Sequence, residues 1–105
     1  MGFNYAIRKN EAQVELYIDR GKDKDEENNQ IFDQLIKYKT EIESEFGEPL
    51  DWQRLDNKRA SRIRKQIIIG GYHDESNWSN IIGQMVDAMI CLEKALKPYI
   101  AKLTI

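Results

Sequence analysis

The chain has 105 residues, 41% of them hydrophobic, and a net charge of −2, which is the size and composition of one globular domain. A single cysteine, Cys91, excludes an internal disulfide and favours a reducing compartment, so we expect a cytoplasmic protein. No apolar run approaches the roughly 20 residues that a membrane span needs, so no membrane partner is expected.

The charges are unevenly distributed along the chain. Residues 11–51 hold 13 acids and five bases, whereas residues 52–75 hold six bases and three acids. One part of the surface should therefore repel polyanions and another should attract them, which suits an oriented contact with a nucleic acid.

Alternating apolar and polar residues predict two β-hairpins. The first covers residues 3–8 and 13–19, with a tight turn at residues 9–11. The second covers residues 50–55 and 59–69 and turns at Asp56-Asn57-Lys58.

Two helices are predicted from apolar residues spaced three and four apart. The first is a single amphipathic helix from Ile31 to Phe46, which Gly47 ends by adopting a left-handed conformation. The second runs from Trp78 to Leu103 with an unusually wide apolar face, and Asp74 or Ser76 would be its N-cap.

The element order ββαββα predicts an α+β fold. Four strands in two hairpins can form one antiparallel sheet, and both helices can pack on one of its faces. We therefore expect a two-layer sandwich that forms a single domain over residues 1–105.

The second hairpin carries the most distinctive surface. If its isoleucines face the helices, Arg62, Arg64 and Gln66 face away from them, together with Glu15 and Tyr17 of the first hairpin. Guanidinium groups bind phosphates, and aromatic rings stack on unpaired bases. Trp52 and Arg54 share a face, which could be this one. The predicted nucleic-acid-binding residues are Arg54, Lys58, Arg59, Arg62, Arg64, Lys65, Trp52 and Tyr17.

The same face has a second interpretation that stays open. Glu15 can lie opposite Arg62 or Arg64, and cross-strand ion pairs of this kind contribute under about 1 kcal/mol each on a solvated surface. In that case the arginines bind carboxylates of their own chain instead of phosphates.

Catalytic patterns are weak throughout the chain. Asp56-Asn57-Lys58 has the acid-x-lysine spacing of a metal-dependent nuclease, but Asp and Asn are common in turns for backbone reasons. His73 is the sole histidine and has no second ligand cluster. We predict no catalytic residue, metal, cofactor or small-molecule substrate.

The wide apolar face of the last helix is either core or a subunit interface. One sheet face can cover a single stripe of such a helix, so the flanking apolar residues need another cover, from the first helix or from a second copy of the chain. The residues predicted for a homodimer interface are Ile82, Met85, Met89, Leu92 and Leu96.

Four segments of the sequence together resemble the bacterial family called domain of unknown function 4268. They are residues 12–19, 42–50, 55–63 and 85–96. The resemblance implies a domain that commonly ends longer proteins, often behind a segment similar to the PD-(D/E)XK nuclease fold. It also implies that relatives carry sequence ahead of the first hairpin that this chain lacks. It supplies no activity and no catalytic residues.

From the residues and the resemblance, the leading hypothesis is a non-catalytic module that contacts DNA or RNA. It would be an accessory to a nuclease- or restriction-type protein, and its basic hairpin, residues 52–65, would bind phosphates. The alternative is a structural or homodimerisation module without nucleic-acid binding, and a metal-dependent nuclease ranks third.

Overall fold

The computed structural model describes residues 1–54, 60–68 and 70–103. Within them, the strands form one antiparallel sheet in the order β1-β2-β4-β3, with helices packed on one side, so the predicted α+β architecture is confirmed. The elements are β1 (Gly2–Ile7), β2 (Ala12–Ile18), α1 (Asp25–Ile36), α2 (Lys39–Phe46), β3 (Asp51–Gln53), β4 (Ser61–Ile67), the 3-10 turn η1 (Glu75–Asn77) and α3 (Trp78–Ile100).

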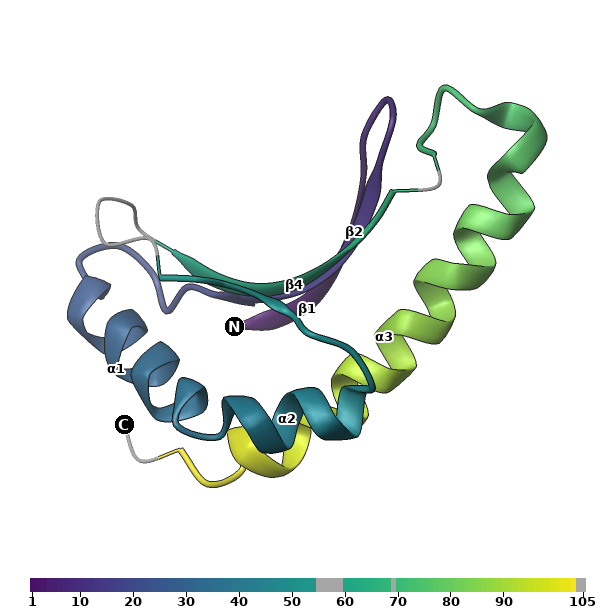
Figure 1. Ribbon diagram of the computed structural model, residues 1–105. Coiled ribbons are helices and arrows are strands. Elements are labelled where there is room, and N and C mark those ends of the chain that lie inside the picture. Colours follow the sequence, from purple (N-terminus) through teal and green to yellow (C-terminus); the bar gives the residue numbers. More distant parts are fainter. Residues whose placement is uncertain (55–59, 69, 104–105) are drawn as a thin grey trace.

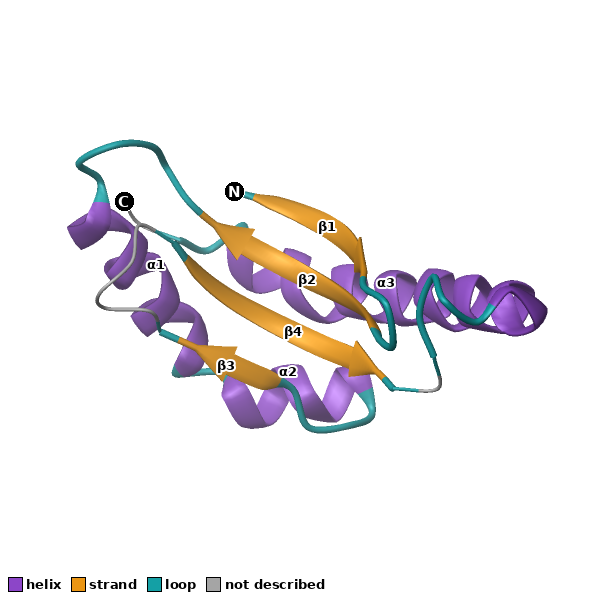
Figure 2. Ribbon diagram, turned by 90° about the horizontal axis from the view of Figure 1, so that it is seen from above, coloured by secondary structure: helices purple, strands orange, loops and turns teal. Residues whose placement is uncertain are grey.

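The sheet is curved, and the helices lie on its convex side (Figure 1). Alternate residues of the two central strands point to that side, where Val14 and Leu16 of β2 and Ile63 and Ile67 of β4 are buried against the helices. In the described part of the chain, no helix or strand lies over the opposite, concave face, as the view from above the sheet shows (Figure 2).

The helix predicted from Ile31 to Phe46 is two helices. α1 ends at Ile36 and α2 begins at Lys39, because Tyr38 adopts φ −104° and ψ 20° and the Tyr38 N–H bonds to the Leu35 carbonyl instead of continuing the α-helical pattern. The break lets the two helices run in different directions beneath the curved sheet (Figure 1). The apolar spacing continues across it, so the sequence pattern alone did not reveal it.

The ends of the other elements agree in part with the sequence. Gly47 caps α2 with φ 98°, as predicted. The predicted N-cap of the last helix is wrong: α3 begins at Trp78, after η1, and the side chain of Asp74 instead accepts a hydrogen bond from the Gly71 N–H. The predicted turn at residues 56–58 lies outside the described residues.

Candidate interaction surfaces

The concave face of the sheet carries the predicted row of arginines. Tyr17 of β2 lies opposite Arg62 of β4, and Glu15 lies opposite Arg64, so these four side chains share the uncovered face. Gln66 follows on the same side, opposite Gln13. The predicted orientation of Arg62, Arg64, Gln66, Glu15 and Tyr17 is therefore confirmed.

Both arginines are held by side chains of their own sheet. The Arg64 Nε donates to Asp51 Oδ2 at 2.8 Å, and the Arg64 Nη1 donates to Gln13 Oε1 at 2.8 Å. The Arg62 Nε donates to Gln53 Oε1 at 2.6 Å, and Arg62 lies 3.8 Å from a carboxylate oxygen of Glu15.

Two further bonds close these contacts into a ring. Gln13 donates to Glu15 at 3.1 Å, and Gln53 donates to Asp51 at 2.9 Å. We call this set the polar ring; its members, taken in bonding order, are Gln53, Asp51, Arg64, Gln13, Glu15 and Arg62. It spans β3, β4 and β2.

The polar ring contributes no net charge to the concave face. Its two guanidinium groups face two carboxylates, so the formal charges within it cancel. Gln13 and Glu15 point to this face and are nevertheless buried, at 2% and 7% exposure. Fully satisfied buried polar networks are rigid, and leaving one member unpaired is costly. A phosphate would have to compete with Glu15 and Asp51 for the arginines.

Trp52 does not lie on this face, contrary to the suggestion from the sequence. It pairs in register with Ile63, which places it on the helix side of the sheet. There its ring packs edge-on against Phe32 at 6.1 Å, and its indole N–H donates to Glu43 at 3.0 Å. The alternation within Asp51-Trp52-Gln53 is the signal that could have revealed this, since the polar residues on either side both belong to the polar ring.

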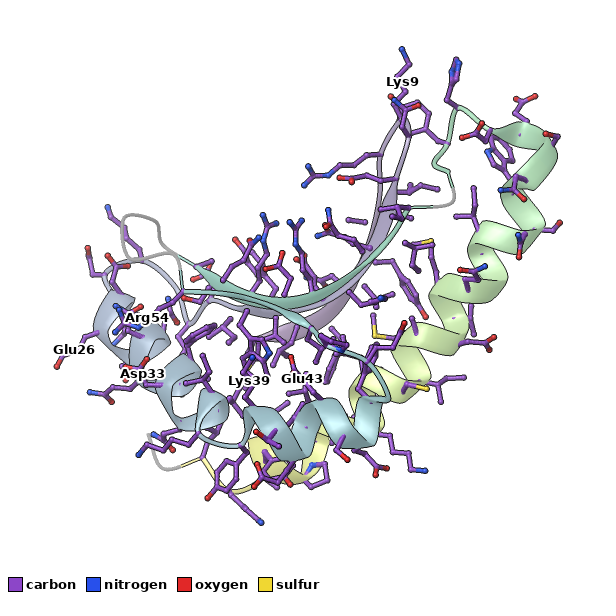
Figure 3. The ribbon with its side chains drawn as sticks, in the orientation of Figure 1. Lys9, Glu26, Asp33, Lys39, Glu43 and Arg54 are labelled. Atoms are coloured by element: carbon purple, nitrogen blue, oxygen red, sulfur yellow. The ribbon has the colours of Figure 1, made fainter. Side chains whose placement is uncertain are left out.

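The other predicted phosphate-binding residues are dispersed. Arg54 makes two hydrogen bonds to the Asp33 carboxylate of α1, at 2.9 and 3.2 Å (Figure 3). Lys65 lies opposite Val14, on the helix side of the sheet, with its Nζ 3.4 Å from Glu48. Lys58 and Arg59 lie outside the described residues. The described members of the predicted set therefore do not form one basic patch.

Glu43 of α2 is a residue that the sequence analysis missed. One of its carboxylate oxygens accepts both the Leu50 N–H, at 2.8 Å, and the Trp52 indole N–H, while Lys39 lies 3.8 Å from the other (Figure 3). Burial raises the pKa of Glu43, but these donors and the lysine outweigh it, so the pKa lies below its ordinary value. Glu43 thus attaches β3 to α2 in its ionised form.

The predicted dimer residues of α3 divide into two groups. Met85, Met89, Leu92 and Leu96 are buried in the core of the chain, at 7%, 5%, 0% and 0% exposure, whereas Ile82 is 54% exposed. The four buried residues face the sheet or the other helices and are not available to a partner in this fold. Of the two interpretations left open for this face, these four residues belong to the core.

A separate apolar stripe of α3 is exposed. It consists of side chains four residues apart: Trp78 at 41%, Ile82 at 54%, Val86 at 43% and Ile90 at 61% exposure. This spacing places them on one flank of the helix, beside its buried stripe. We call these four residues the α3 stripe.

The α3 stripe lies on the same side of the molecule as the edge strand β1. The other flank of α3, with Gln84, Ala88 and Cys91, borders Lys65 and Ile67 of β4 around a cavity of about 250 Å³. The stripe must then face away from β4, toward the side where β1 forms the outer edge of the sheet (Figure 2). On β1, Tyr5 and Ile7 point to the helix side and are also exposed.

Comparison with known families identifies the domain. Residues 1–100 match the family described as Domain of unknown function (DUF4268). The chain belongs to this family. No curated protein and no solved structure matches it. The family description assigns no activity, so the surfaces of this DUF4268 domain carry the functional argument.

Metal binding and membrane spanning can be checked against the described part of the DUF4268 domain. It contains no group of three or more His, Cys, Asp or Glu side chains placed to hold a metal ion. Asp56 and Lys58, considered for a nuclease site, lie outside it. None of its helices has the length and apolar character needed to cross a membrane.

Proposed function

We propose that this DUF4268 domain is a structural, non-catalytic module that joins two copies of its own chain. The observation that carries the proposal is the α3 stripe, a row of large apolar side chains that its own fold leaves exposed. Single exposed apolar residues are normal, but a contiguous row flanked by polar residues is typical of a protein-binding surface.

The stripe has the form of a helix-docking surface. Side chains at i, i+4, i+8 and i+12 line one flank of a helix and can pack against an apolar partner surface. Complete burial of a Val or Ile side chain contributes about 1.5–3 kcal/mol, and tryptophan is enriched among the residues that dominate binding energy. The arginines of the concave face are paired with carboxylates of the polar ring, so this face gives weaker support for a partner-binding role than the α3 stripe does.

We expect Ile82→Glu/Ile90→Glu to convert a dimeric parent into a folded monomer, because two carboxylates cannot be buried in an apolar interface without a large desolvation cost. Sedimentation equilibrium over a concentration series measures the dimer, and circular dichroism checks the fold. The matched control is Gln84→Glu/Cys91→Glu, which adds the same charges on the opposite, exposed flank of α3 and should leave the dimer intact. A parent that stays monomeric at all concentrations contradicts the proposal.

Nucleic-acid contact by the concave face is the second candidate. It is favoured by the exposed ring of Tyr17 beside Arg62, an aromatic group and a guanidinium on an uncovered face. Because Glu15 and Asp51 engage both arginines, binding would require phosphates to displace carboxylates.

That competition gives the second candidate a specific test. If phosphates compete with the carboxylates, Glu15→Gln/Asp51→Asn should bind a single-stranded oligonucleotide more tightly than the parent, and affinity should fall steeply with salt. Fluorescence anisotropy at low salt measures this, with Arg62→Ala/Arg64→Ala as the variant expected to lose binding. Equal signals from all three proteins would exclude the arginines as phosphate ligands.

A further inference from the structure

The free edge of β1 has none of the features that keep sheet edges apart. Residues 2–7 contain no charged residue and no proline, and the pairing with β2 runs from Gly2 to Ile7 without a bulge. Monomeric proteins protect exposed edges with charges, prolines or bulges, because an unprotected edge pairs readily with another strand. β1 is therefore suited to accept one.

The hydrogen-bond pattern shows which groups of β1 are available. Arg8 donates its N–H to the carbonyl of Glu11, its opposite residue, at 2.7 Å. In an antiparallel ladder the bonding direction alternates along the strand, so every second residue before Arg8 also bonds to β2. The intervening residues, Phe3, Tyr5 and Ile7, direct their N–H and C=O groups to the open edge.

We propose that the partner at this edge is β1 of a second copy, paired antiparallel about a two-fold axis at Tyr5, so that two four-stranded sheets form one continuous eight-stranded sheet. This rests on the proposed function, for which it supplies the geometry. With Tyr5 opposite its own counterpart, Phe3 lies opposite Ile7 of the second copy. Each outward N–H then meets an outward C=O, and the same faces of the two sheets stay on the same side.

The second copy also covers the apolar residues beneath the edge. Tyr5 and Ile7 are exposed on the helix side of β1, and the α3 stripe faces the same side of the molecule. A two-fold axis at the edge places Tyr5, Ile7 and the α3 stripe of the second copy next to the same residues of the first. The same dimer would therefore pair the free backbone groups of β1 and cover the exposed apolar side chains. The strand carries no charge that would repel its symmetry mate.

Hydrogen exchange of the parent protein tests the pairing without any substitution. The amides of Phe3, Tyr5 and Ile7 should exchange slowly at concentrations where the dimer forms and rapidly on dilution, because their protection comes from the second copy. Amides of Asn4 and Ala6, bonded to β2, should stay protected at both concentrations. Exchange at Phe3, Tyr5 and Ile7 that does not depend on protein concentration overturns the proposal.

Tyr5→Pro tests it independently. Proline removes an outward N–H, which an edge strand tolerates, together with the tyrosine ring, so the monomer should fold, while the dimer dissociation constant should rise at least about tenfold. The control is Tyr5→Ala, which also loses the ring but keeps the N–H, so its dissociation constant should rise clearly less than that of Tyr5→Pro. If Tyr5→Pro dimerises as well as the parent while Ile82→Glu/Ile90→Glu is monomeric, the β1 pairing is wrong and the proposed function stands; a monomeric parent removes both.

Discussion

Gly71→Ala should unfold the protein or lower its free energy of unfolding by about 3 kcal/mol or more, whereas Gly83→Ala should raise it by about 0.5–1 kcal/mol. At Gly71 the added Cβ would collide with the Arg8 carbonyl oxygen and would lie 2.6 Å from the Glu11 nitrogen and 2.7 Å from the Lys9 carbonyl carbon. These are backbone atoms, which cannot rotate away as a side chain can.

The collision would also break the contacts that fasten the β1–β2 turn. Tyr72 donates its N–H to the Arg8 carbonyl at 2.9 Å, and His73 donates to the Lys9 carbonyl at 3.1 Å. Moving the turn to admit a methyl group separates both pairs.

Gly83 is the opposite case. It is exposed within α3, its added Cβ meets nothing within 4 Å, and alanine is the better helix former there. Urea denaturation followed by circular dichroism measures both changes. Similar effects of the two substitutions would contradict the close approach at Gly71.

Glu43→Ala should lower the free energy of unfolding by about 2–3 kcal/mol, because it leaves the Leu50 N–H and the Trp52 indole N–H without their acceptor. Glu43→Gln keeps an acceptor oxygen but loses the charge, so its cost should be smaller, about 1 kcal/mol. Glu41→Ala is the control: it removes an exposed acid from the same helix and should change stability by less than about 0.5 kcal/mol.

The lowered pKa of Glu43 gives this contribution a pH dependence. A carboxyl whose folded pKa lies below its unfolded value stabilises the fold fully above the unfolded value, about 4.3, and loses that contribution as pH falls through the folded pKa. The stability difference between the parent and Glu43→Gln should therefore be constant near neutral pH and shrink below about pH 4. A difference that stays constant down to acid pH would contradict the ionised anchor.

The features that depend on local sequence patterns were predicted correctly. The strand pattern placed Arg62 and Arg64 on the face that carries Glu15, and Gly47 was correctly assigned the left-handed cap. The interpretation in which Glu15 pairs with an arginine of β4 is present in the structure, although the ring also needs Gln13, Asp51 and Gln53. Their roles depend on the register between strands distant in sequence, which alternation along one strand does not give.

The predictions that were wrong concern features that depend on tertiary geometry. The break at Tyr38 follows the curvature of the sheet, and no local pattern records that curvature. In α3 the repeat every three and four residues identified an apolar face, but which half the sheet covers depends on how the helix lies across it. Met85 and Met89, which the sequence predicts for a dimer interface, belong to the core, whereas Val86 and Ile90 are exposed.

The contact of Gly71 and Tyr72 with the β1–β2 turn also has a kinetic consequence. The turn closes locally, but the residues that fasten it lie far along the chain, after both helices of the first half and the whole of β4. Contacts between distant segments carry a large loop-closure entropy and tend to form after local structure. The first hairpin can thus form early, whereas its contacts with Gly71 and Tyr72 form late. A change at Gly71 should therefore act mainly on the unfolding rate and little on the folding rate.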